Sequence, residues 1–140
     1  MTEQRETRKE IIARYAAGVQ AVDDALAGLA EADLDLARAQ DKWTIREIAH
    51  HIADAEDLWE IACKSALGNC GCLLDVSWYI IDNKWAEPLQ YATRPVDEAL
   101  NLYRAIRHQV LELLEHVPGA WEKHVLFHRG DPRHLHMIDL

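Results

Sequence analysis

The sequence lacks any apolar run approaching the ~18 residues that a membrane-spanning helix needs. Residues 2–10 are polar and charged, unlike an export signal. Basic residues are also scarce, because 15 Lys and Arg face 24 Asp and Glu and the formal net charge is −9. Such an excess of negative charge repels phosphate backbones. We therefore expect a cytoplasmic protein that binds neither a membrane nor nucleic acid.

Cysteine is scarce as well. The chain has only Cys63, Cys70 and Cys72, and an odd number without an export signal argues against a disulfide framework. Cys70-Gly71-Cys72 is shorter than the usual Cys-x-x-Cys loop of metal and redox sites, and a second pair is missing. We expect Cys63 to be a small core residue. No pattern in the chain supports a phosphate-binding loop or a serine triad.

What the sequence does contain is helical periodicity. Its 140 residues, 49% of them hydrophobic, fit a single domain over residues 1–140. Apolar residues spaced by three and four predict long helices over residues 3–29, 44–67 and 95–117. Residues 30–43 and 70–92 have no such stripe and predict connections, the second with a short helix inside it. The expected fold is an all-α bundle.

The stretch from Trp43 to Trp59 is the most informative. Thr44 followed by Glu47 is a capping box, so a helix should begin there. A narrow sector of this helix, predicted to face the core, carries Ile48, Ile52, Ala55 and Trp59. His51 lies roughly 60° from the centre of that sector and His50 roughly 160° away. We therefore expect His51 to border the interior and His50 to face water.

Eight histidines make a metal site worth testing, since neutral imidazole is a common ligand for zinc and nickel. His51 is the best placed, although a histidine beside an apolar face is more often a core residue that holds no metal. His124 and His128 are spaced like a helical two-histidine clamp. However, Val125 and Phe127 favour extended backbone, in which the two histidines would lie about 13 Å apart.

Residues 42–56 strongly resemble the second-helix signature of the DinB/YfiT-like superfamily. That signature has Trp-Ser/Thr, a hydrophobic pair around Arg-Glu, and then His followed by Leu/Ile-Ala-Asp. Here it reads Trp43-Thr44, Arg46-Glu47 and His51-Ile52-Ala53-Asp54. The order of the remaining segments fits the same family.

The resemblance implies a four-helix bundle in which a divalent metal is bound by three histidines, one from the second helix and two from the fourth. By motif position, His51 is the first of these ligands, and zinc or nickel is the expected metal. A fourth helix would begin near Asp131-Pro132 and would be incomplete within this chain. His134 and His136 match the approach to that helix and not its ligand pair.

The same resemblance implies a metal-dependent thiol transferase or hydrolase, with a small-molecule thiol as a substrate. A bound metal lowers the pKa of a thiol and supplies a thiolate at neutral pH. The alternative is a non-enzymatic stress-associated or assembly protein without a competent metal site. The sequence singles out no catalytic residue. Because an incomplete fourth helix would expose an apolar groove, we also expect a homodimer.

Overall fold

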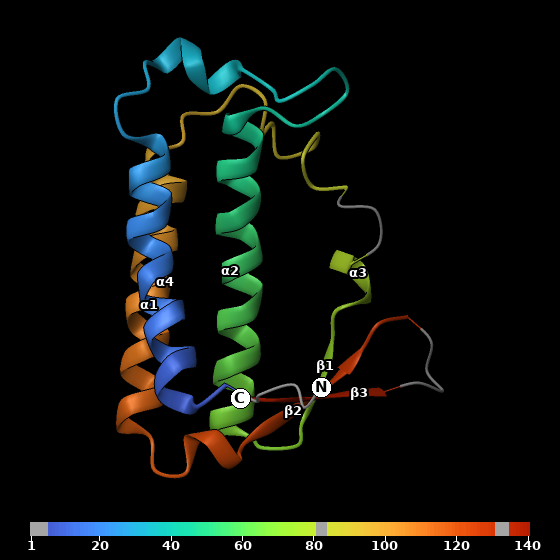
Figure 1. Ribbon diagram of the computed structural model, residues 1–140. Helices are drawn as coiled ribbons and strands as arrows, with labels where there is room; N and C mark the ends of the chain where they lie inside the picture. The colour runs from blue at the N-terminus through green and yellow to red at the C-terminus, as the bar shows by residue number, and fades with distance from the viewer. Residues whose placement is uncertain (1–5, 81–83, 131–134) are drawn as a thin grey trace, which may run out of the picture.

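A computed structural model describes residues 6–80, 84–130 and 135–140. Three long helices, α1 (Arg8–Leu26), α2 (Ile45–Gly68) and α4 (Asp97–His116), run side by side (Figure 1). A sheet of β1 (Leu73–Asp75), β2 (His124–His128) and β3 (Leu135–Asp139) lies near the carboxyl end of α2. The connections contain the short helix α3 (Ser77–Ile80) and the 3-10 helices η1 (Glu31–Asp35) and η2 (Ala120–Glu122). The helical bundle is therefore confirmed.

The predicted start of α2 is confirmed by both hydrogen bonds of the capping box. Thr44 Oγ1 accepts a hydrogen bond from the Glu47 backbone N–H at 3.2 Å, and the Glu47 carboxylate accepts from the Thr44 N–H at 2.8 Å. This capping box satisfies two of the amide groups that the first turn leaves without helical partners. Within the residues described, no helix is long and apolar enough to cross a membrane.

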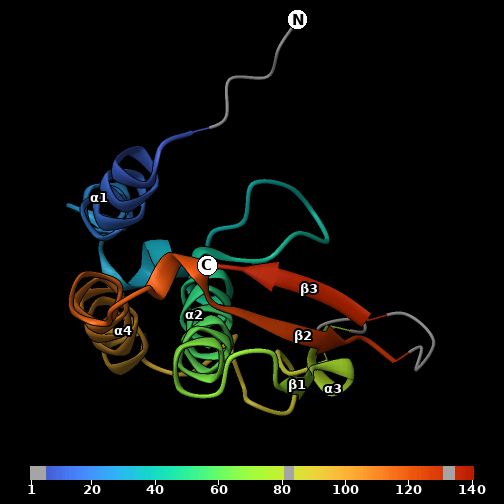
Figure 2. The same ribbon diagram turned by 90° about the horizontal axis from the view of Figure 1, so that it is seen from below.

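The three-stranded sheet corrects the all-α prediction. β1 pairs in parallel with β2, and β2 pairs antiparallel with β3. The extended backbone predicted for His124–His128 is confirmed, with Val125 and Phe127 buried in one cluster with Leu58 of α2. Figure 2 shows the sheet on the side of α2 away from α4.

The predicted fourth helix is wrong where it can be seen, because Leu135–Asp139 is strand β3. Its expected start at Asp131-Pro132 lies outside the described residues. Five residues are too few to show a helical stripe, so the available partner decides their structure. β2 offers a free edge, and β3 pairs along it with Val125 opposite Ile138.

The core sector predicted for α2 also needs correction. Ile48 and Trp59 are 46% and 47% exposed, whereas Ala49 and Ala53 are buried against α4. Small side chains let two helices approach closely, so the alanine face is the one that meets α4. The sheet covers a second face of α2 around Leu58. The large apolar residues between these two faces remain partly open.

What we call the α1–α2 groove consists of two apolar hollows beside α1 and α2, whose walls combine partly open residues with buried ones such as Ala49 and Cys63. In α1 no residue is fully buried. The upper part of the groove is lined by Val22, Ala25, Leu26, Ile45, Ile48, Ala49 and Ile52. The lower part is lined by Ile11, Ile12, Tyr15, Trp59, Cys63, Val110, Leu114, Trp121 and Leu140. None of these side chains carries a charge.

Candidate functional site

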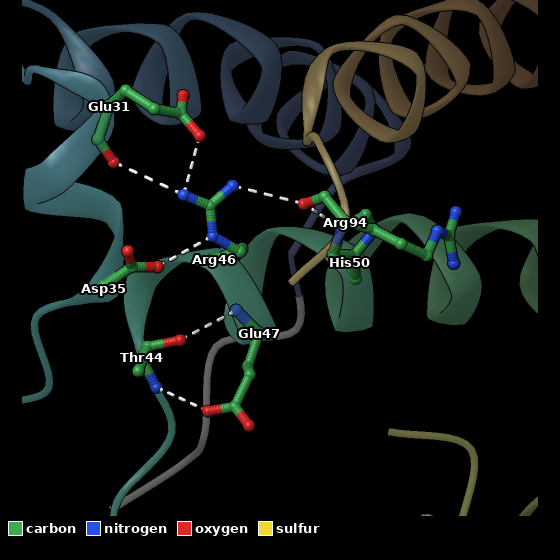
Figure 3. Close-up of polar contacts among 7 residues, drawn as sticks. All are labelled: Glu31, Asp35, Thr44, Arg46, Glu47, His50 and Arg94. Carbon is green, nitrogen blue, oxygen red and sulfur yellow. Dashed lines mark hydrogen bonds and ion pairs between the residues drawn. The ribbon is translucent and has the colours of Figure 1, made fainter. Parts of the chain in front are cut away.

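Arg46 fixes the first turn of α2 against two other segments of the chain (Figure 3). It is only 5% exposed. Its Nε donates to Asp35 Oδ1 at 2.8 Å, and its Nη2 donates to Glu31 Oε1 at 2.7 Å and to the Glu31 carbonyl at 3.3 Å. Its Nη1 donates to the Arg94 carbonyl at 3.2 Å. The planar guanidinium can serve all these acceptors at once, so the backbone around the two histidines is held firmly.

His50 is a buried structural residue, and the prediction that it faces water is wrong. It is 2% exposed, and its Nε2 lies 3.3 Å from the Arg94 carbonyl oxygen. Its ring stacks on Tyr91 with centroids 5.4 Å apart. The sequence predicts a core-facing side of the helix at Ile48, and His50 lies on the opposite side. Because α4 packs on the alanine face, His50 turns toward the interior.

His51 is half-buried, at the border of the interior as predicted. Its ring and that of Trp43 pack edge to face, with centroids 4.8 Å apart and an interplanar angle of 72°. Burial lowers the pKa of His51, and the charge of Asp54 partly opposes that shift. The imidazole is therefore mainly neutral near pH 7, which is the form that binds a metal ion.

Asp54 lies one turn beyond His51 and is held by a buried tyrosine. The Tyr91 hydroxyl donates a hydrogen bond to the Asp54 carboxylate. Burial raises the pKa of Tyr91, and the hydrogen bond to the negatively charged Asp54 raises it further. The Tyr79 hydroxyl is also buried and has no hydrogen-bond partner among the described residues. Sequence reasoning missed both tyrosines, since they come from an irregular segment whose path depends on the whole fold.

The described residues do not complete a metal site. Over residues 6–80, 84–130 and 135–140, no group of three or more His, Cys, Asp or Glu side chains could hold a metal ion. His128 Nδ1 lies 3.3 Å from Asp75 Oδ1, and His124 Nδ1 lies 3.6 Å from Cys70 Sγ. His134 lies outside the described residues. The histidines of the sheet are therefore not gathered around His51.

The comparison with protein families identifies the chain. A family model described as the DinB superfamily matches residues 14–138, which include the signature around His51. The chain belongs to the DinB superfamily. The family that residues 42–56 resemble is thus confirmed by a match that covers most of the chain.

A solved structure supports the same DinB fold. YfiT from Bacillus subtilis, described as "a probable metal-dependent hydrolase with an unusual four-helix bundle topology", matches with a TM-score of 0.77. The sequence identity is 18%, and the match covers 100% of this chain and 78% of YfiT. At this identity the likeness shows the fold alone. No curated protein matches the chain.

Proposed function

We propose that this DinB-superfamily chain is a metal-dependent enzyme of the hydrolase or thiol-transferase type, with His51 as one metal ligand. The observation that carries the proposal is the setting of His51, a half-buried imidazole beside Trp43 whose pKa is lowered by burial, with a carboxylate one turn away. The description of YfiT as a probable metal-dependent hydrolase supports the same class. Zinc or nickel suits an imidazole ligand.

The residues around His51 would orient it. The Trp43 ring restricts the imidazole from one side. Tyr91 holds the Asp54 carboxylate close enough to His51 for its charge to raise the pKa of that imidazole. A bound metal would lower the pKa of a water molecule or of a small-molecule thiol. The alternative, a non-enzymatic stress-associated or assembly protein, is favoured by the incomplete donor set of the described residues.

Metal analysis of the purified chain tests the proposal. After expression with added zinc or nickel, we expect stoichiometric metal in the parent protein. His51→Ala should lose this metal, while His108→Ala, which alters an exposed histidine of α4, should retain it. Elemental mass spectrometry after gel filtration gives both values. A folded parent chain without metal would reject the proposed class and favour the non-enzymatic alternative.

We also propose that a second copy of the chain covers the α1–α2 groove. Each copy carries a net charge of −9, so two copies repel one another over most of their surface. The groove walls hold no charged side chain, so two copies can meet there without that repulsion. A symmetric dimer would bring the same apolar patch together from both sides.

The dimer proposal predicts that Ile48→Glu weakens self-association about tenfold or more, because it places a charge against an apolar surface. Leu102→Glu is the matched control, since Leu102 is similarly exposed at 44% but lies on α4. Light scattering across micromolar concentrations measures the dissociation constant. A parent chain that is monomeric throughout, or equal effects of the two variants, would rule out a homodimer through the groove.

A further inference from the structure

The three cysteines have different surroundings. Cys63 is buried, and burial raises the pKa of its thiol. Cys72 is half-buried, and its Sγ donates to the Ser65 carbonyl at 3.7 Å. Cys70 is exposed, and its Sγ lies 3.6 Å from Nδ1 of His124. Among these three thiols, Cys70 alone combines access from solvent with a neighbouring imidazole.

The contact between Cys70 and His124 is built on fixed backbone. The Gly71 N–H donates to the His124 carbonyl at 2.9 Å, and the Leu126 N–H donates to the Cys72 carbonyl at 2.9 Å. Gly71 has φ +80°, a value that residues with a side chain rarely adopt. The backbone directly after Cys70 is therefore tied to β2, which begins with His124.

This pair is separate from the proposed metal site. Cys70 follows the carboxyl end of α2, while His51 lies in the first third of that helix. At 1.5 Å per residue, the distance along the helix from His51 to its end is roughly 25 Å. The sequence gives little sign of the pair because 54 positions separate its two members.

We propose that Cys70 and His124 form a thiol–imidazole dyad, in which Cys70 is the nucleophile that forms a mixed disulfide with low-molecular-weight disulfides. In the tautomer with its proton on Nε2, His124 accepts the thiol proton at Nδ1. Thiol–disulfide exchange needs access to the attacking sulfur and an acceptor for its proton, and the exposed Cys70 beside His124 Nδ1 has both.

The exchange between the Cys70 thiol and a disulfide R–S–S–R needs no other reactant. Cys70 Sγ gives its proton to His124 Nδ1 and forms a bond to one sulfur of R–S–S–R. The original S–S bond breaks, and its electron pair leaves with the second sulfur as R–S⁻. That thiolate takes the proton from His124 and departs as R–SH. The products are the Cys70–S–S–R mixed disulfide and one free thiol.

The test uses the full chain and glutathione disulfide as the probe, with a chelator present so that no metal contributes. A Cys72→Ser background prevents the neighbouring thiol from displacing the adduct. Peptide mass spectrometry at timed intervals measures the rate at each remaining cysteine. We expect Cys70 to react first, and His124→Gln to slow it about tenfold or more. His128→Gln, on the same strand and face, is the matched control and should keep the parent rate.

A second measurement does not depend on the His124 variant being folded. The rate at Cys70 is compared between the folded chain and the chain unfolded in urea. We expect it to be several-fold faster in the folded chain, since only folding brings His124 to Cys70. An equal or slower rate overturns the proposal. The proposal is also overturned if Cys63 is labelled before Cys70, or if a folded His124→Gln variant reacts at the parent rate.

Discussion

Replacing Arg107 with Met should lower the free energy of unfolding by about 3–5 kcal/mol. Arg107 extends from α4 to both other long helices. Its Nη2 lies 3.1 Å from Glu56 Oε2 of α2, and its Nη1 donates to the Tyr15 carbonyl of α1 at 2.7 Å. The Arg107 and Glu56 side chains are only 19% and 9% exposed. Without Arg107, the Glu56 carboxylate would remain buried with no counter-charge.

The surroundings of Arg107 strengthen this expectation. The guanidinium lies 4.0 Å from the ring centroid of Tyr15 and 5.1 Å from that of Tyr103, so two cation–π contacts would also be lost. The Tyr15 hydroxyl donates to Glu56 as well. Gly18 makes room for the guanidinium, since a Cβ there would lie 2.5 Å from Arg107 Nη1.

Arg104→Met is the matched control. Arg104 lies one turn earlier on α4 and contacts Asp23 of α1 at 2.5 Å, but both side chains are 35% exposed. An ion pair this open to water contributes about 0–1 kcal/mol. Urea unfolding followed by circular dichroism compares the two variants. Equal losses of unfolding free energy would show that the pair of Arg107 and Glu56 is not effectively buried.

Adding Glu56→Gln to Arg107→Met should recover part of the lost unfolding free energy, because it removes the buried carboxylate that has no counter-charge.

Arg46→Lys should destabilise the chain by about 2–4 kcal/mol although it keeps the positive charge. A single ammonium cannot reach the Glu31 and Arg94 carbonyls together with the Asp35 carboxylate. The carbonyls left without a donor would raise the free energy of the folded state. The expected local result is a looser contact between η1, the start of α2 and the segment before α4.

Urea unfolding measures the total loss for Arg46→Lys, and hydrogen exchange locates it. Faster exchange is expected for the amides near the start of α2 and for those of Arg94, Val96 and Asp97. Arg38→Lys serves as the control, because Arg38 is exposed and has no ion pair within the described residues; its effect should stay within about 0.5 kcal/mol. A change no larger than that of the control would mean that Arg46 does not hold these segments together.

Much of the helical scaffold can be predicted from the sequence because its signals are local. The Thr44–Glu47 capping box involves residues three apart, and the helix geometry itself brings them together. The apolar stripe of α4 is long enough to show which face is buried, and Tyr103, Ile106 and Val110 are indeed buried. The signature around Trp43 likewise predicts the superfamily from adjacent positions.

The sheet was harder to predict because strand pairing depends on distant partners. β1 and β2 are adjacent in space, yet Leu73 pairs with Leu126. The segment Leu135–Asp139 carries no strong pattern of its own, so the edge of β2 decides its structure. The helix expected here rested on Asp131-Pro132 as a helix start and on the family resemblance, and not on a stripe in these residues.

The candidate site divides in the same way. The sequence by itself determined that the capped helix places two adjacent histidines at different angles, and it placed His51 at the border of the interior. Only the tertiary structure decided that His50 would be buried, because the packing of α4 on the alanine face of α2 fixes which side is inward. Only the tertiary structure brought Tyr91 to Asp54 and His124 to Cys70. Local spacing fixes an angle on a helix, whereas its neighbours are fixed by contacts between segments far apart in the chain.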